Sequence, residues 1–316
     1  MAGRRVVITG IASHLGTELA RRLEQDAAIE HVAGIDTRPP RVRLERTEFI
    51  EADIRSPVVT RLLPRVAPDT LVHNRIERLP GPQAHDINVI GTLQLLAACE
   101  KTPSLEAIVI RGSAGIYGAE PAAPQFFTEE MANLYPLRTR FQRDVGEIEN
   151  YFETFANRHP EVTCTMLRYQ PAIGRGLRTQ IARYLSLRAV PTYMGFDPRI
   201  QLIHVEDALD ALVAAVARPV RGAVNVAAEG TIGLTRMIRM AGRPVVPIPH
   251  PAFAAATGAA RRLGLPPFSH DLRRLLQHGR AVDVTRLVEE VGYRPRYTTA
   301  EAVADFAGSR VEAEAA

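Results

Sequence analysis

A regular alternation of short apolar runs and longer amphipathic segments fills the first 170 residues of this 316-residue chain and constrains its fold more than any other feature. The apolar runs show little polar alternation, which indicates strands that are buried on both faces. Strands are predicted at 4–10, 31–36, 47–54, 69–74, 106–113 and 162–169, and helices at 15–25, 57–66, 84–101 and 140–157. Strands that alternate with helices form a parallel sheet between two helical layers, so an α/β fold is predicted.

Right-handed connections make such a sheet doubly wound and Rossmann-like. After residue 170 prolines and glycines multiply and the apolar runs shorten, although a run at 222–228 is predicted to return to the sheet. The remainder is predicted to form a smaller, mostly helical C-terminal lobe over the carboxyl edge of the sheet. We expect a nucleotide-binding domain over 1–170, completed by a strand and a helix from about 200–228, and a substrate-binding lobe mainly over 171–316.

Composition argues against several other classes of protein. Hydrophobic residues make up 46% of the chain, and no apolar run approaches the roughly 20 residues of a membrane span. The net charge is +4, but the arginines are scattered and aromatic residues are few, so no nucleic-acid surface is predicted. The two cysteines lack metal-ligand spacing, which predicts buried thiols, no metal site and a cytoplasmic location.

The segment TGIASHLG at 9–16 joins the first predicted strand to the first helix. Gly10 and Gly16 occupy the outer positions of a dinucleotide-binding loop, where the chain turns tightly and the backbone approaches a pyrophosphate. Ser13 replaces the middle glycine, and its hydroxyl can bond a phosphate oxygen. The unpaired N–H groups at the start of the following helix complete an anion site. The loop therefore predicts a bound dinucleotide.

Acidic residues at two strand ends define this prediction further. Asp36 ends the second strand, where a carboxylate accepts hydrogen bonds from the ribose hydroxyls of adenosine and repels a 2′-phosphate. This favours NAD over NADP as the cofactor, although nearby Arg38 points the other way. Asp53 and Ile54 end the third strand, where an adenine would pack.

Further motifs follow along the chain, namely EADIR at 51–55, DTLVH at 69–73, NVIGTLQLLAAC at 88–99, GSAGIYG at 112–118 and IQLIHVEDALDAL at 200–212. From about residue 4 to 307 the chain resembles the extended short-chain dehydrogenase/reductases of the NAD-dependent epimerase/dehydratase family. It is similar in particular to the actinobacterial relatives of UDP-glucose 4-epimerase. These motifs are specific for the family and not for one substrate within it.

The resemblance implies a set of cofactor contacts. The residues that would touch the pyrophosphate are Gly10, Ser13, His14, Leu15 and Gly16. Asp36 would hold the ribose, and the adenine would lie against Asp53 and Ile54. The strand end at His73 and Asn74 would pass beneath the cofactor, although HNRI here departs from the family's H-x-A-A.

Two polar residues would serve the active site of such a protein. Asn88 would support its backbone from the long helix, and Ser113 would hydrogen-bond the substrate oxygen that undergoes the redox change. His204 matches a family position that could line the substrate or serve the structure. The arginines that could grip a diphosphate in the lobe are Arg168, Arg175, Arg178 and Arg199.

The family's chemistry requires a tyrosine and, four residues later, a lysine on one helix face. In one register Tyr135 is the acid–base group, but Pro136 places it outside the helix. In the register we favour, the two reactive positions hold Phe141 and Val145. Neither register contains a lysine, because Lys101 is the single lysine of the chain.

Three functions remain open from the sequence. The first is an NAD-dependent oxidoreductase of the epimerase/dehydratase type that acts on a nucleotide-sugar-like substrate, with Ser113 polarising the substrate and Tyr135 replacing the missing pair. The second is a non-catalytic NAD-binding sensor or scaffold. The third is a reductase for a lipid-linked substrate, which the arginine-rich stretch 250–279 would hold at a membrane, although packing as a lobe helix is favoured for that stretch. The resemblance also implies a homodimer through the helices at 84–101 and 140–157.

Overall fold

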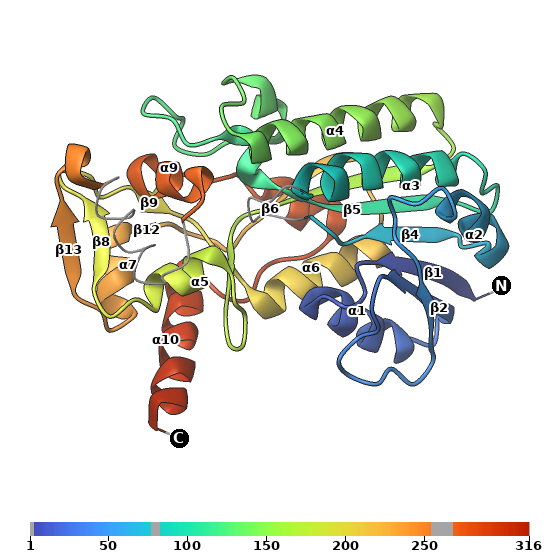
Figure 1. The fold of residues 1–316 in the computed structure, drawn as a ribbon, viewed down its shortest axis with the longest axis horizontal. Coiled ribbons are helices and arrows are strands. Elements are labelled where there is room, and N and C mark those ends of the chain that lie inside the picture. The colour runs from blue at the N-terminus through green and yellow to red at the C-terminus, as the bar shows by residue number, and fades with distance from the viewer. Residues whose placement is uncertain (1–2, 77–82, 254–267, 316) are drawn as a thin grey trace.

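Seven parallel strands form the centre of the molecule in a computed structural model that describes residues 3–76, 83–253 and 268–315 (Figure 1). Their order across the sheet is β11-β6-β5-β4-β1-β2-β3, and every neighbouring pair is parallel. The strands are β1 Arg4–Thr9, β2 Ile29–Asp36, β3 Thr47–Glu51, β4 Thr70–His73, β5 Ala107–Ser113, β6 Thr163–Tyr169 and β11 Gly222–Val226. The predicted doubly wound α/β sheet and the returning strand are confirmed.

Helices cover both faces of this sheet (Figure 1). One face carries α1 (His14–Glu24) and α6 (Val205–Ala217), which pack against each other. The other face carries α2 (Val59–Val66), α3 (Gly91–Cys99) and α4 (Arg140–Arg158). The helix predicted over 84–101 is interrupted, because its first part, Asp86–Ile90, forms a π-helical turn before α3 begins. The order of the strands reverses between β1 and β4, which places a crevice at their carboxyl ends.

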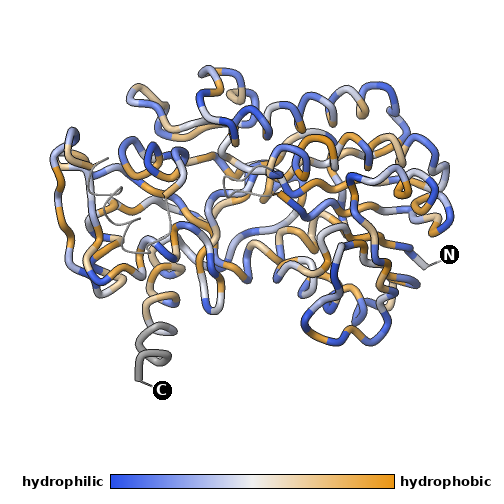
Figure 2. The backbone as a smooth tube through the Cα atoms, in the orientation of Figure 1, coloured by the Kyte–Doolittle hydropathy of each residue, from blue (hydrophilic) through white to orange (hydrophobic). Residues whose placement is uncertain are grey.

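The hydrophobic core has two layers, one on each face of the sheet. Hydrophobic residues follow the central strands and the inner sides of the helices, whereas the outer turns of α4 are hydrophilic (Figure 2). The strand residues Val6 and Ile8 pack with α1 and α6, and Val7 and Ile108 pack with α2, α3 and α4. Residues next to each other in one strand thus enter opposite core layers, as the near-continuous apolar runs predicted.

A smaller lobe follows the sixth strand, as predicted. Its helices include α5 (Gln180–Leu185), α7 (Leu234–Met240), α9 (His270–His278) and α10 (Thr299–Ala315), which share a hydrophobic cluster. Short two-stranded sheets, which the sequence did not indicate, join β7 (Ala172–Ile173) to β10 (Ile203–His204), β8 (Val190–Tyr193) to β13 (Val245–Ile248), and β9 (Arg199–Ile200) to β12 (Ile232–Gly233).

The structure bears on the stretch 250–279 only in part. Residues 254–267 lie outside the described residues, and α9 at its end packs into the lobe through Leu272, Leu275 and Leu276. None of the helices in the part of the chain that the structure describes is both long and apolar enough to cross a membrane.

Candidate functional site

The glycine loop turns sharply between β1 and α1. Gly10 has a φ of +74°, a left-handed conformation that favours glycine. A Cβ at Gly16 would lie 2.4 Å from the carbonyl oxygen of Gly10, so this close approach also needs glycine. Ser13 caps α1 by accepting a hydrogen bond from the N–H of Gly16, and it donates to the carbonyl of Gly10. The side chain of Asn74 donates to the Ser13 hydroxyl at 3.0 Å and ties the loop to the end of β4.

The first turn of α1 is open to an anion. It contains no acidic residue, and the N–H groups at a helix start have no partner inside the helix. His14 is exposed in this turn, whereas Leu15 is buried and lines the large cavity described below. The structure therefore places all five loop residues of the prediction around one helix start.

A second pocket of about 160 Å³ lies on the β2–β3 side of the loop, lined by Gly10, Asp36, Asp53, Ile54 and Arg75, among others. The Asp36 carboxylate is buried and accepts hydrogen bonds from the backbone N–H groups of Ala12 and Thr37. It also pairs with Arg75 at 3.2 Å. The Asp36 carboxylate, predicted to bind a ribose, is therefore already bonded to protein groups. Its ion pair with Arg75 was not predicted from the sequence.

Asp53 and Ile54 line the same pocket, but β3 ends at Glu51, before both of them. They lie in the turn that follows the strand. The Arg55 side chain donates to both carboxylate oxygens of Asp53, and this hydrogen bonding lowers the pKa of Asp53.

His73 lies inside the core at the end of β4. Its ring nitrogens lie 2.6 Å from the Thr9 hydroxyl and 3.1 Å from the Thr92 hydroxyl. Burial lowers the pKa of His73 to about 4. Asn88 is also buried, and its side-chain N–H lies 3.4 Å from the carboxylate of Asp144 on α4. The two residues join neighbouring elements beneath the crevice.

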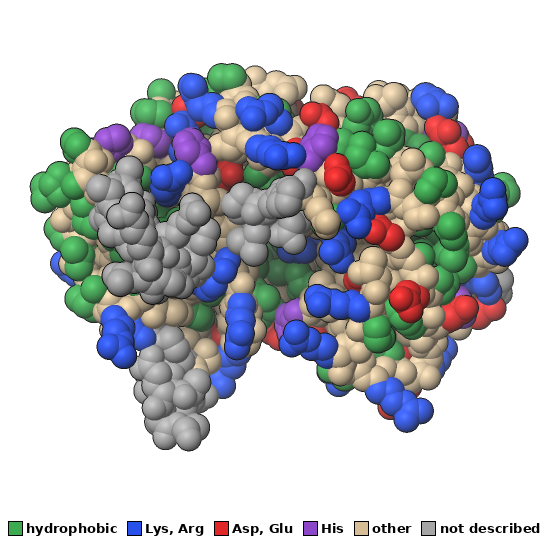
Figure 3. All heavy atoms as spheres, in the orientation of Figure 1, with side chains coloured by type: hydrophobic (Ala, Val, Ile, Leu, Met, Phe, Trp, Pro, Cys, Tyr) green, Lys and Arg blue, Asp and Glu red, His purple; other side chains and the backbone are tan. Residues whose placement is uncertain are grey.

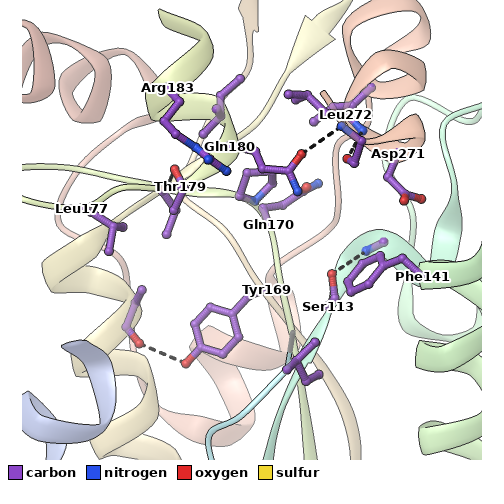
Figure 4. A pocket seen from close by; sticks show the side chains of 18 of the residues that line it. Ser113, Phe141, Tyr169, Gln170, Leu177, Thr179, Gln180, Arg183, Asp271 and Leu272 are labelled. Atoms are coloured by element: carbon purple, nitrogen blue, oxygen red, sulfur yellow. Dashed lines mark hydrogen bonds between the residues drawn. The ribbon is translucent and has the colours of Figure 1, made fainter. Parts of the chain in front are cut away.

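The larger cavity has a volume of about 300 Å³ and lies between the sheet and the lobe. Figure 3 shows Lys and Arg side chains on both rims of the hollow between these two parts. Ser113 lines the cavity at the end of β5, and Phe141 lines it from the first turn of α4 (Figure 4). A Cβ at Gly115 would lie 2.9 Å from the Phe141 ring and 3.1 Å from the Ser113 hydroxyl oxygen, so the ring and the hydroxyl flank the same point.

The start of α4 is fixed by a capping box between Thr139 and Gln142. Val145, one turn after Phe141, is buried in an apolar cluster with Ala114, Ile116 and Tyr117. The inner side of the first two turns of α4 therefore presents apolar side chains at positions 141 and 145. Lys101 lies just after α3, in the connection to the opposite end of β5.

The tyrosine hydroxyls near this site bond to protein groups. Tyr135 precedes α4, as predicted, and its hydroxyl donates to the carbonyl of Ala122 at 2.6 Å; it does not line the cavity with Ser113. Tyr117 donates to the side chain of Asn225, and burial raises the pKa of Tyr117 to about 12. Tyr169 lines the cavity, but its hydroxyl donates to the carbonyl of Ala208 at 3.0 Å (Figure 4).

Of the four predicted diphosphate-binding arginines, only Arg178 lines the cavity. Arg168 is buried and pairs with Glu149 of α4 at 2.7 Å. Arg175 pairs with Asp305, and Arg199 lies exposed in β9. His204 caps α6 and stacks on Tyr297, which supports a structural role rather than a place in the cavity.

The structure adds polar cavity residues that the sequence analysis missed, namely Arg111, Arg183, Asp271 and Arg280. Arg280 is buried, donates to Gln170 and to the carbonyl of Gly118, and has a pKa that burial lowers to about 10. Asp271, near the start of α9, accepts a hydrogen bond from Thr139 at 2.6 Å. One signal was available in the sequence: Arg111 precedes Ser113 by two residues in a strand, so both side chains lie on the same face.

Comparisons with known proteins agree with this fold. The model described as the NAD dependent epimerase/dehydratase family matches residues 6–227. An uncharacterized protein of Mycobacterium tuberculosis is 36% identical over 310 residues, which cover 95% of this chain and 82% of that protein. The UDP-glucose 4-epimerase of Mycolicibacterium smegmatis is 25% identical over 327 residues, covering 95% of this chain and 96% of the epimerase. The dTDP-glucose 4,6-dehydratase of Bacillus anthracis, solved with NAD, has a TM-score of 0.74 at 15% identity, covering 99% of this chain and 98% of that one.

Proposed function

The chain belongs to the NAD-dependent epimerase/dehydratase family, and from that premise we propose that it binds NAD and a nucleotide-sugar-like ligand without the family's tyrosine–lysine proton transfer. The observation that carries the proposal is the position of Phe141. Its ring lines the cavity together with the Ser113 hydroxyl, and in the register we favour this position is the one that needs a proton-transferring hydroxyl. A phenyl ring has no proton to exchange.

The fit of NAD rests on the glycine loop. The close approach of Gly16 to Gly10 and the acid-free first turn of α1 leave room and positive potential for a pyrophosphate. The pocket at Asp36 and Ile54 would take the adenosine. When bound, the nicotinamide supplies the capacity to accept or release a hydride, and Ser113 would hold the oxygen of a ligand beside it.

The fit of a nucleotide sugar rests on the arginines of the cavity. Arg178, Arg183 and Arg280 line it together, and the fork of a guanidinium group matches phosphate oxygens. The M. smegmatis and B. anthracis proteins carry the names of enzymes for UDP-glucose and dTDP-glucose. A sugar attached to a diphosphate is therefore the ligand class we propose.

The loss of proton transfer rests on two positions of α4. Besides Phe141, Val145 occupies the place of the lysine and is buried among apolar side chains. The hydroxyl of Tyr135 is bonded to Ala122 outside the cavity. We therefore propose that Tyr135 does not replace the missing group, and that the protein serves as an NAD-dependent sensor or scaffold.

Calorimetry and a turnover assay test this proposal together. Titration with NAD, followed by UDP-glucose and dTDP-glucose on the NAD complex, should give saturable binding. Chromatography should then recover either sugar nucleotide unchanged, since epimerisation and dehydration return the hydride within each cycle and leave no net reduced nicotinamide to follow. Failure to bind NAD would refute the proposal as a whole, whereas steady turnover would refute only its non-catalytic part.

One observation favours a second function, an oxidoreductase with a different proton carrier. Among the described residues that line the cavity, Asp271 is the only one with a carboxylate, and it shares the cavity with Ser113. A carboxylate can serve as general acid or base. If turnover is found, Asp271→Asn and Ser113→Ala should each abolish it without weakening NAD binding. Tyr135→Phe is the matched control and should leave the rate unchanged.

A further inference from the structure

Arg111 is a charged cavity residue for which the described residues supply few partners. It lies in β5 two residues before Ser113, so both side chains project from the same face of the sheet. Both line the cavity between the sheet and the lobe. An arginine at this point puts a permanent positive charge next to the hydroxyl that would hold the ligand.

No carboxylate of the described residues pairs with the guanidinium group of Arg111. One terminal nitrogen donates to the carbonyl of Asn74 at a long 3.4 Å, and the guanidinium carbon lies 5.8 Å from the centre of the Tyr169 ring. Its Nε is buried and has no hydrogen-bond partner among the described residues. Burial lowers the pKa of Arg111, yet the group remains charged at neutral pH. The side chain as a whole is half-buried, and a partly desolvated cation without a carboxylate is a favourable site for an anionic ligand.

The surroundings of Arg111 indicate which part of a ligand would reach it. Asn74, whose carbonyl it contacts, also bonds Ser13 of the glycine loop through its side chain. Leu15 of the same loop lines the cavity together with Arg111. Arg111 therefore shares the cavity both with the start of α1, which would bind a pyrophosphate, and with Ser113.

We propose that Arg111 binds an oxyanion of the ligand in this cavity, either the second phosphate of the dinucleotide or a carboxylate on the sugar. The inference rests on the proposed function, because it needs a dinucleotide on the glycine loop or a sugar nucleotide beside Ser113. Both sources offer paired oxygens to the guanidinium fork, which accepts them in a bidentate manner.

Substitution Arg111→Gln tests the proposal with four probes: NAD, AMP, UDP-glucose and UDP-glucuronate. If the dinucleotide supplies the oxyanion, the variant loses about 10- to 100-fold in affinity for NAD, the range of one charge-assisted pair, and none for AMP, which lacks the second phosphate. If the sugar supplies it, NAD affinity is unchanged, and the variant loses affinity for UDP-glucuronate but not for UDP-glucose. Unchanged affinity for all four probes overturns the inference.

A control variant and the binding measured for the wild type distinguish failure of the Arg111 inference from failure of the proposed function. Arg21→Gln is the matched control, because it removes an equal charge from an exposed position of α1 and should change no affinity. A wild-type chain that binds neither NAD nor a sugar nucleotide would refute the proposed function and the inference with it. Wild-type binding that Arg111→Gln leaves intact would refute the inference alone.

Thermal unfolding of the ligand-free protein distinguishes a ligand-binding role from a structural one. Removal of this half-buried cation, which has no carboxylate partner among the described residues, should leave the midpoint of the free protein unchanged or raise it, while the upward shift caused by the ligand is reduced. A lower midpoint of the free Arg111→Gln protein, with the ligand-induced shift preserved, would show that Arg111 serves the fold and would overturn the inference.

Discussion

The two ends of the ligand crevice depart from the family pattern in different ways. At the glycine loop, Ser13 replaces a glycine, but its hydroxyl caps α1 and bonds the carbonyl of Gly10, so the loop keeps a shape that fits a pyrophosphate. At the start of α4 the shape is also kept, with a capping box at Thr139 and an anchoring pair between Glu149 and Arg168. There, in the register we propose, the two reactive positions of the family hold Phe141 and Val145.

This difference shows which requirements the fold itself imposes. A helix needs its cap, its packing face and partners for its buried charges, and α4 retains all three. A phenolic hydroxyl and an ammonium group are needed only for proton transfer. If Phe141 and Val145 stand in their places, as we propose, α4 keeps the form of a catalytic helix without its reactive groups.

The largest effect we expect comes from Gly16→Val at the loop end. The new side chain would begin 2.4 Å from the carbonyl oxygen of Gly10, and the backbone must move to relieve this overlap. NAD binding should fall below detection by calorimetry, a loss of at least about 1,000-fold or 4 kcal/mol.

Gly308→Ala is the control for this substitution, because a Cβ at Gly308 in α10 meets no atom within 4 Å. It should leave NAD binding unchanged. Retained binding in Gly16→Val would mean that the glycine loop is not the pyrophosphate site.

Glu149→Gln should have the next largest effect, now on the α4 end. Glu149 receives hydrogen bonds from Nε and Nη2 of Arg168, and the two side chains are only 13% and 8% exposed. Neutralising Glu149 leaves a buried guanidinium group without its counter-ion, and breaking such pairs costs about 3–5 kcal/mol. Urea unfolding measures the loss as a lower midpoint.

The exposed pair of Glu18 and Arg21 on α1 provides the matched control, since Glu18→Gln should cost less than about 1 kcal/mol. Equal losses at the two sites would show that the pair between Glu149 and Arg168 does not anchor α4 in the way we describe.

His73, at the end of β4 beneath the glycine loop, should make the free energy of unfolding depend on pH. Its pKa is lowered from 6.5 to about 4 by burial, so between these values the unfolded chain binds a proton that the folded protein does not. The unfolding free energy therefore rises with pH in this range, and the contribution of His73 is lost as the pH falls from 6.5 towards 4. The difference amounts to about 3 kcal/mol.

The wild type and His73→Gln should be unfolded with urea at a series of pH values across that range. The carboxylates titrate in both proteins, so the difference between the two curves isolates the histidine. Parallel curves would mean that His73 is not held neutral by the fold.

Much of the fold followed from local patterns in the sequence. The apolar runs gave the strands from β1 to β6 and the return of β11, because strands buried on both faces have a distinct composition. The glycine loop and the acid at Asp36 followed from the strand–turn–helix order. The end of β3 before Asp53 and the π-helical turn before α3 were not predicted, since tertiary packing decides such boundaries.

The parts of the site that could not be predicted depend on contacts between distant segments. The pairing of Arg75 with Asp36 and the arrival of Asp271 from α9 join residues far apart in the chain. The prediction that Arg168 could bind a diphosphate was wrong for the same reason. Its partner, Glu149, lies on a different element of the fold. Residue type alone does not say whether an arginine faces a ligand or a buried carboxylate.

The smallest effect we expect is that of Phe141→Tyr, which would restore a hydroxyl at the α4 end. The ring already lies against Gly115 at the cavity wall, so the added oxygen should change the unfolding free energy by less than about 1.5 kcal/mol. Because Val145 provides no ammonium group, the new phenol should keep a pKa near ~10 and stay protonated at neutral pH. Turnover of sugar nucleotides should therefore be absent at neutral pH and increase in alkaline buffer, as measured by chromatographic separation of the product from the substrate. Phe126→Tyr, at an exposed position, is the matched control and should show no turnover at any pH. An identical pH profile for both variants would mean that position 141 does not face the reacting atoms.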